Sequence, residues 1–237
     1  SWTDNSDNET GFKIERKSGS EDFTLIKTTD VNIISFKDIN LEEDTEYVYK
    51  VFAFNSTHET GEYSNNVVVT TFGKAVFKQP KATSITPFSI TIESNIIDER
   101  GSSVTKRGVL WSANSNPTIA LETKTDDGSG AGTFSSNISG LDWDTEYYIR
   151  SYAISEVGTS YGEELILSTD ALDITTSSIS KVTPFSLISG GIIAGDDPAS
   201  SIISRGVVWS LSPNPTIEHS ISIDGAGTGD YVSELSG

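Results

Sequence analysis

The stretch RGVLWS at residues 107–112, followed by NPTI at residues 116–119, occurs twice in this chain. Its second copy is RGVVWS at residues 205–210, followed by NPTI at residues 214–217, so the offset is 98 residues throughout (from 107 to 205). A period near one hundred residues is too long for the unit of a solenoid and matches the length of a whole domain. The chain is therefore predicted to consist of tandem domains, whose boundaries follow from where each copy begins and ends.

The composition limits the classes of protein that the chain can belong to. Of its 237 residues, 35% are hydrophobic and 9% aromatic, which is enough for the cores of small domains. No run of 18 apolar residues occurs, so we expect no membrane insertion in this segment. Cys is absent, which excludes disulfides, Cys-ligated metals and thiol catalysis. The formal net charge of −18 repels nucleic acid and anionic lipid, so neither is expected as a partner.

Alternating apolar residues predict strands in the first third of the chain. Phe12 and Ile14 share one face of residues 11–16, and residues 47–54 alternate in the same way. Shorter strands are expected at residues 23–26, 33–36 and 65–71. Nothing in residues 1–72 keeps a helical period for more than one turn, so this part is predicted to be all-β.

These strands carry a resemblance to the fibronectin type III domain. Residues 2–16 resemble its B–C region, residues 63–71 resemble its strand G, and Leu41 with Tyr47 resembles its tyrosine corner. In that family the corner hydroxyl bonds back to the backbone. Strand A and most of strand B have no counterpart here, and a β-sandwich without them exposes an edge and part of its core. We therefore expect the chain to be cut from a longer one.

The two later copies resemble a divergent form of the same family. Residues 107–153 follow an Arg-Gly-Val-x-Trp-Ser strand, an Asn-Pro-Thr turn, a Gly-rich hairpin and then Leu-x-x-x-Thr-x-Tyr-Tyr-x-Arg-x-Tyr-Ala. This pattern resembles fibronectin-III-like repeats of Bacteroidetes surface and secreted proteins. The third copy stops one residue before its corner Leu. We predict an all-β fold of tandem immunoglobulin-like, fibronectin type III β-sandwiches at residues 1–72, 73–170 and 171–237, with a linker at residues 73–80.

Three patterns that suggest catalysis or metal binding have simpler interpretations. The GTSYG stretch at residues 158–162 fits a nucleophile elbow, but no strand–turn–helix context surrounds it. The glycines of residues 128–132 and 225–229 lack the spacing of a phosphate loop and are expected to supply positive φ in a hairpin. His58 and His219 lie in different domains, away from acidic clusters with ligand spacing. We therefore expect no enzyme, no catalytic residue and no cofactor.

Acidic residues near turns leave calcium open as a loop or interdomain ligand. Asp4, Asp7 and Glu9 crowd the B–C loop of the first domain, and acidic pairs recur at residues 126–127 and 196–197. Oxygen ligands in flexible loops suit Ca²⁺, although no EF-hand spacing occurs. The simpler interpretation is solvated turn chemistry. Arg107 and Arg205, at the start of their strands, are expected to form ion pairs with these acidic loops.

One strand face and one turn are candidate contact surfaces. Tyr148, Arg150 and Tyr152 alternate on the face of their strand that points away from the core, where exposed aromatic rings beside an Arg can stack on sugars or anchor a protein. An ordinary cross-strand ladder is the simpler interpretation. Trp143 lies in the turn before this strand and is expected to pack on the neighbouring domain.

The combined prediction is a non-catalytic spacer segment of a large secreted or cell-surface bacterial protein, such as an adhesin or a surface fibre. Its expected partners are neighbouring domains of the same longer chain, and surface glycans or proteins. One alternative is a carbohydrate- or protein-binding module. Another is an accessory region of a polysaccharide-degrading enzyme whose catalytic domain lies outside this chain. A further alternative is a fibre in which neighbouring chains supply the missing strands.

Overall fold

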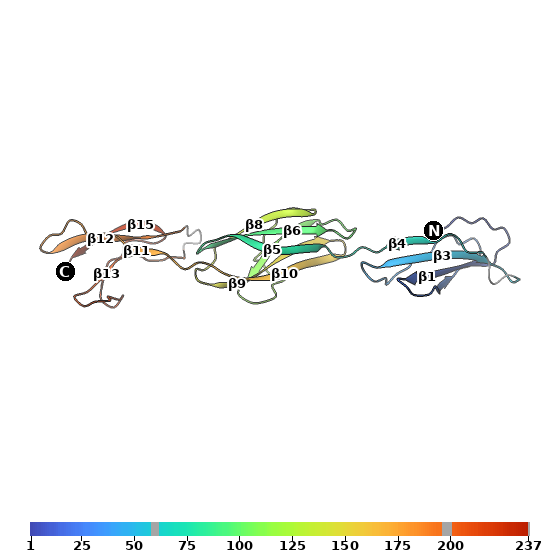
Figure 1. The fold of residues 1–237 in the computed structure, drawn as a ribbon, viewed down its shortest axis with the longest axis horizontal. Coiled ribbons are helices and arrows are strands. Elements are labelled where there is room, and N and C mark those ends of the chain that lie inside the picture. The colour runs from blue at the N-terminus through green and yellow to red at the C-terminus, as the bar shows by residue number, and fades with distance from the viewer. Residues whose placement is uncertain (58–61, 196–200, 237) are drawn as a thin grey trace. The chain divides into compact units, whose positions relative to one another are not determined.

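The computed structural model describes residues 1–57, 62–195 and 201–236, and in these residues the fold is all-β (Figure 1). None of these residues forms a helix that is long and apolar enough to cross a membrane. The chain divides into two compact units whose boundaries cut across the repeat. Unit 1 is Ser1–Val76 with Asp98–Val104 and Ser155–Gly158, and unit 2 is Phe77–Ile97, Thr105–Ile154 and Thr159–Gly237.

Unit 1 is built on one antiparallel sheet in the order β2-β1-β3-β4. Its strands are β1 (Gly11–Ser18), β2 (Thr24–Thr28), β3 (Glu46–Phe54) and β4 (Val67–Thr70). The predicted alternation is confirmed in β1, where Phe12 and Ile14 are only 4% and 3% exposed. The ring of Trp2 packs edge-on against Phe12 with 5.4 Å between centroids. The strand predicted at residues 33–36 is wrong, because a single backbone bond, from Trp2 N to Ile34 O, joins this segment to residues 1–8.

The second repeat is a sandwich of two three-stranded sheets, β5-β6-β8 and β10-β9-β7, which form separate layers in Figure 1. The strands are β5 (Val76–Ile85), β6 (Ser89–Asp98), β7 (Lys106–Ser112), β8 (Gly132–Ser139), β9 (Glu146–Ser155) and β10 (Gly158–Ser168). Every second residue of β6 from Ile90 to Ile96 is buried, which is the pattern of a strand with one face in a core. Since β5 begins at Val76, the predicted linker at residues 73–80 is wrong in its second half.

A hydroxyl pair joins the two layers of the second repeat inside the core. Ser94 lies on β6 and Ser151 on β9, each side chain is only 1% exposed, and their Oγ atoms are 2.6 Å apart. Buried apolar side chains lie two positions away on both strands: Ile92 and Ile96 beside Ser94, and Ile149 and Ala153 beside Ser151, each at most 1% exposed. The two hydroxyls satisfy each other, so the polar pair is buried at little cost.

The third repeat has fewer buried apolar side chains. It contains a sheet in the order β11-β12-β15 and a separate pair β13-β14. These strands are β11 (Ile174–Thr176), β12 (Ser186–Ile193), β13 (Val208–Trp209), β14 (Ser220–Ile221) and β15 (Gly229–Ser236). Its buried hydrophobic residues among those described are Ile193 and Leu235. Phe185 is 83% exposed, whereas its counterpart Phe88 in the second repeat is 0% exposed. The same sequence motif is therefore buried in one repeat and open in the other.

Candidate interaction surfaces

The arginine of the repeated motif binds backbone carbonyl groups. Arg107 Nη1 donates to the carbonyl oxygens of Gly130 and Ala131, at 2.9 Å each, and Nε donates to Asp127 O at 3.3 Å. The expected ion pair with an acidic loop is wrong for Arg107, since the acceptors are backbone oxygens of the Gly-rich hairpin. The glycines are needed here because Gly128, Gly130 and Gly132 all have φ between +79° and +96°, as predicted.

Arg205 repeats this arrangement in the third repeat. Its Nη1 donates to Gly227 O at 3.2 Å and to Thr228 O at 2.5 Å, and Nε donates to Asp224 O at 3.4 Å. Among the described residues the acceptors of Arg205 are again backbone oxygens, and the acidic pair at residues 196–197 lies outside these residues, so its expected ion pair stays a prediction. A guanidinium presents several donors in a rigid plane, so it can hold consecutive carbonyls of one turn. We call each of these two arrangements an arginine socket.

The acidic residue of each socket is bound by hydroxyl groups. Asp127 Oδ2 accepts hydrogen bonds from Thr125 Oγ1 at 2.6 Å and from Ser136 Oγ at 2.5 Å. Asp224 Oδ2 accepts from Ser222 and Ser233 in the same way. These hydroxyl partners tie the acidic side chain to the segment before the hairpin, through Thr125 or Ser222, and to the strand after it, through Ser136 on β8 or Ser233 on β15.

Among the described residues, the acidic clusters proposed for calcium lack the geometry that a metal site needs. In residues 1–57, 62–195 and 201–236, no group of three His, Asp or Glu side chains has the geometry of a metal site. Asp4 accepts a bond from Ser6 N at 3.0 Å, which is turn chemistry. The pKa of Asp126 is lowered by its hydrogen bond to Lys106 and by the Gly128 amide. The pair at residues 196–197 lies outside the described residues, and calcium binding stays a prediction.

The face of Tyr148, Arg150 and Tyr152 is largely used within the chain. Tyr152 is 2% exposed and its hydroxyl donates to Thr125 O at 2.5 Å, so the expected exposure is wrong for this residue. Burial, followed by the charges of the two aspartates at 126–127, raises its pKa. Arg150 Nε donates to Gly162 O at 3.2 Å, with its guanidinium 4.7 Å from the Tyr161 ring centroid. The hydroxyl of Tyr148 donates to Glu146 Oε1 at 3.1 Å.

The Asn-Pro-Thr turn folds back over the same sheet face. Ile119 N donates to Tyr161 Oη at 3.0 Å, and Asn116 N donates to a carboxylate oxygen of Glu164. Asn116 has a φ of +57° and its counterpart Asn214 has +58°, which asparagine tolerates better than most residues. Leu110 on β7 is the cross-strand partner of Arg150 on β9, and it is 0% exposed. The chain's own turn and side chains therefore occupy much of the predicted contact face.

The glycine of the motif allows another strand segment to approach. A Cβ at Gly108 would lie 2.4 Å from Thr125 O and 2.8 Å from Tyr152 Cε1. A Cβ at Gly206 would lie 2.1 Å from Ser222 O. Both distances are far below a van der Waals contact, so each position requires glycine. Val109 is 0% exposed and belongs to the core, and Trp111, two positions along the same strand, is half-buried.

The corner that precedes β3 and the corner that precedes β9 each contain the same set of hydrogen bonds. Glu42 N donates to Tyr47 Oη, and Asp142 N donates to Tyr147 Oη, each at 3.0 Å, so the predicted tyrosine corners are confirmed. A threonine pair adds to each corner: Thr45 N donates to Thr71 Oγ1 in the first repeat at 3.0 Å. The equivalent bond joins Thr145 and Thr169, also at 3.0 Å. Sequence reasoning missed the threonines that follow β4 and β10, although both lie at the same place in the repeat.

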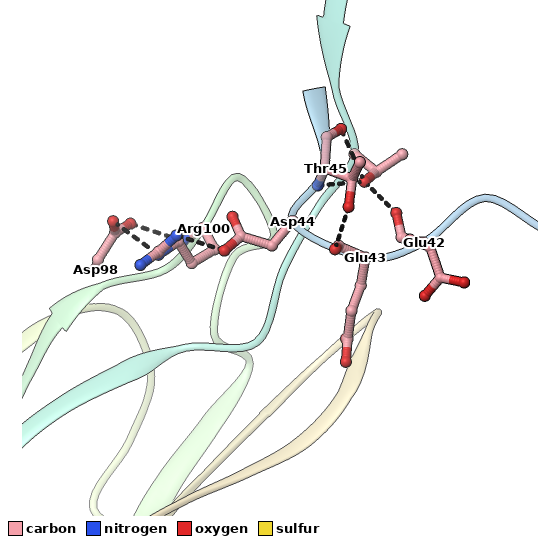
Figure 2. A network of polar contacts seen from close by, with 7 residues as sticks. Glu42, Glu43, Asp44, Thr45, Asp98 and Arg100 are labelled. Atoms are coloured by element: carbon pink, nitrogen blue, oxygen red, sulfur yellow. Dashed lines mark hydrogen bonds and ion pairs between the residues drawn. The ribbon is translucent and has the colours of Figure 1, made fainter. Parts of the chain in front are cut away.

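A second polar cluster in unit 1 gathers at the corner of the first repeat (Figure 2). Arg100 lies between Asp98 and Asp44, with Nε 3.2 Å from Asp98 Oδ2 and Nη1 2.5 Å from Asp44 Oδ2. Asp44 is next to Glu43, whose side chain pairs with Lys74 at 2.8 Å. Arg100, Asp98 and Asp44 were assigned no role from the sequence, because nothing in their residue types distinguishes them from solvated turn residues.

The remaining candidates do not form sites. Ser160, in the elbow-like stretch, is 4% exposed within the continuous strand β10, without the helix that an elbow needs. His219 Nδ1 accepts a bond from Thr216 N at 3.0 Å, and His58 lies outside the described residues. Trp143 is 46% exposed, so its expected packing against a neighbouring domain stays a prediction.

Comparison with known proteins adds little to this. No protein-family model and no curated protein matches the chain. Among solved structures, the chain is similar to the crystal structure of the FN1–FN3 domains of chicken CNTN1, with 19% sequence identity and a TM-score of 0.36. The similarity covers 69% of this chain and 57% of that one, so the chain spans little more than half of its relative. The predicted all-β fold class is confirmed by the antiparallel sheets of the described residues, among which the second repeat forms a β-sandwich.

Proposed function

We propose that this chain is a non-catalytic spacer segment of a larger protein that is secreted or displayed on a cell surface. The observation that carries the proposal is the repetition of the arginine socket at Arg107 and Arg205. In both copies the arginine binds carbonyl oxygens of the Gly-rich hairpin, and hydroxyl groups bind the aspartate that precedes it. A loop whose charged and polar groups are occupied in this way stabilises a domain and offers little to a substrate.

The construction of the second repeat suits a load-bearing role. Its strands run up to eleven residues, which corresponds to about 36 Å at about 3.3 Å per residue. Antiparallel ladders and a core of fully buried isoleucines join these strands. The net charge of −18 opposes association between copies of the chain. An adhesin or surface fibre, of the kind that the Bacteroidetes resemblance implies, is the context we propose.

Stretching single molecules tests the spacer role. With the chain held between two handles, we expect the second repeat to unfold in one abrupt step. Residues 73–170 would release about 30 nm of chain, from about 3.5 Å per residue less the folded length. Gradual extension without a step would contradict a load-bearing role.

Binding is the second candidate function, and Trp143 favours it. An indole that is 46% exposed at a turn can stack on a sugar ring or anchor a protein. A glycan array probed with the wild-type chain and with Trp143→Ala tests this role. Binding that the variant loses would establish it, and no binding by the wild type would exclude the glycan form. The accessory region of a polysaccharide-degrading enzyme is the setting in which such binding would serve.

A further inference from the structure

The turn of residues 98–101 contacts the corner of the first repeat through several independent groups, all within unit 1. Arg100 Nη1 pairs with Asp44 Oδ2 at 2.5 Å, and Gly73 N donates to Arg100 O at 2.9 Å. The side chain and the backbone of one residue therefore reach two different segments of unit 1, the corner before β3 and the start of the linker after β4. A single exposed ion pair is worth little, but here a backbone hydrogen bond accompanies it.

The shape of the contact leaves no room for side chains at two glycines. A Cβ at Gly73 would lie 2.8 Å from Asp44 Cβ and 3.1 Å from Arg100 Cβ. A Cβ at Gly101 would lie 2.7 Å from Phe72 Cδ1, and Gly101 has a φ of +80°. Both glycines are thus required by the contact.

Hydrogen bonds within the turn of residues 98–101 and its next residue hold the backbone conformation that this contact uses. Arg100 has a φ of +49°, a conformation that costs a non-glycine residue free energy and persists where the surroundings hold it. Asp98 Oδ1 accepts the Arg100 amide at 2.8 Å, and Ser102 N donates to Glu99 O at 3.1 Å. With the turn held in this way, the guanidinium of Arg100 reaches Asp44 while its carbonyl accepts the Gly73 amide.

We propose that the corner of the first repeat is a binding surface for the Arg-Gly turn of the repeat that follows it, and that this contact fixes the conformation of the linker. We call the contact the clasp, defined as Asp44, Gly73, Arg100 and Gly101. Asp44 contributes the carboxylate, and Gly73 contributes the amide donor and leaves room because it has no side chain. Arg100 contributes both the guanidinium that pairs with Asp44 and the carbonyl that accepts the Gly73 amide. The inference rests on the spacer role, which it deepens by naming what restrains the linker.

The sequence of the third repeat indicates that the clasp is specific to the first linker. The receiving corner recurs, since Asp144 has a φ of +48° and its amide donates to Asp170 O at 3.1 Å. Ala171 takes the place of Gly73, however. Counting back from Arg205 as from Arg107, Pro198 and Ala199 take the places of Arg100 and Gly101. The sequence of the third repeat thus offers neither the guanidinium nor the glycines at the equivalent positions.

Amide hydrogen exchange in the full chain tests the clasp at the Gly73 amide. The variant Arg100→Asn removes the guanidinium, and asparagine tolerates positive φ, so the turn keeps its backbone preference. We expect exchange at Gly73 to accelerate about two- to fivefold, the range of an exposed ion pair. A rise in salt to about 1 M should produce part of the same change in the wild type. The variant Gly101→Ala should accelerate exchange at least as much.

Two other amides serve as controls in the same measurement. Thr71 N donates to Thr45 O within the first corner, and Thr169 N donates to Thr145 O within the second, each at 3.0 Å. Neither bond involves Arg100, so both amides should keep their wild-type exchange rates. Lys106→Ala, which removes an exposed ion pair elsewhere in the second repeat, should leave Gly73 unchanged.

Trypsin cleavage after Lys74 gives an independent readout, since its side chain is 51% exposed while Ala75 is buried. We expect Arg100→Asn to speed this cleavage. The clasp is overturned if Gly73 exchanges at the unprotected rate in the wild type, or if Arg100→Asn changes neither exchange nor cleavage. Either result leaves the stretching experiment untouched, so the clasp can fail while the spacer role stands.

Discussion

The guanidinium of Arg107 lies over the ring of Phe134, with 4.9 Å between its carbon and the ring centroid. The same relationship recurs between Arg205 and Tyr231 at 5.3 Å. One face of each guanidinium is thus stacked on an aromatic ring, while its N–H groups reach the carbonyls of the hairpin. A lysine ammonium has no plane to stack and fewer donors, so it cannot replace arginine in this role.

Arg107→Lys is therefore expected to lower the free energy of unfolding of the second repeat by about 1.5–3 kcal/mol, the range for hydrogen bonds to a charged group. Urea unfolding followed by tryptophan fluorescence measures this loss. Lys106→Ala is the matched control, because its ion pair with Asp126 is exposed and should contribute less than about 1 kcal/mol. Equal losses in the two variants would show that the socket adds nothing.

Tyr147→Phe is expected to cost about 1 kcal/mol, because the Asp142 amide loses its acceptor. Tyr148→Phe removes a hydroxyl that bonds to Glu146 on the sheet surface, so it should change stability by less than about 0.5 kcal/mol. Urea midpoints for the two variants give the comparison. A larger effect at Tyr148 than at Tyr147 would argue against the corner as a stabilising element.

Ile92→Ala is expected to destabilise the second repeat by about 2–5 kcal/mol, since a fully buried side chain leaves a cavity. Ile97 is the control on the same strand, and it is 59% exposed. Ile97→Ala should change stability by less than about 0.5 kcal/mol. Thermal or urea unfolding of both variants measures the difference, and a mild effect at Ile92 would mean that the repeat repacks around the gap.

Alkaline pH is expected to destabilise unit 1 through Tyr49. Burial, then the hydrogen bond from its hydroxyl to Asp38 at 2.8 Å, raises the pKa of Tyr49 to about 12, whereas an unfolded tyrosine titrates near 10. The folded state holds the proton more tightly, so this contribution is complete below pH 10 and is lost as the pH rises toward 12.

Absorbance titration of tyrosinate in the wild type and in Tyr49→Phe isolates this group by difference. The difference curve should show one group with a pKa near 12 in native buffer and near 10 in concentrated urea. Tyr49→Phe should also flatten the loss of stability between pH 10 and 12. A difference curve centred at 10 in native buffer would rule out the proposed coupling to Asp38.

Elements that depend on local periodicity were predictable from the sequence. The alternation in β1 and the spacing of Leu41 and Tyr47 both follow from how a single strand or corner buries its own residues. The offset between the copies at Arg107 and Arg205 likewise indicated that one repeat is built twice. These features need no knowledge of which distant segments meet.

Features that depend on backbone partners were not predictable. A carbonyl acceptor has no residue signature, so the sequence suggested a carboxylate for Arg107 where the structure has Gly130 O and Ala131 O. Tyr152 alternates like an exposed residue, and it is buried because Gly108 lets the segment of Thr125 approach. Arg100 looked like any charged turn residue, and its role depends on a corner more than fifty positions earlier.

The hydroxyl pair of Ser94 and Ser151 bears on how the second repeat resists a pull along its strands. Two purely aliphatic layers can slide past each other with small changes in buried area, because hydrophobic contact has no direction. Sliding here would separate two buried hydroxyls and leave both without partners, at a cost of about 1–3 kcal/mol each. The hydrogen bond between Ser94 and Ser151 is therefore expected to resist sliding of one sheet past the other when the ends of the repeat are pulled apart.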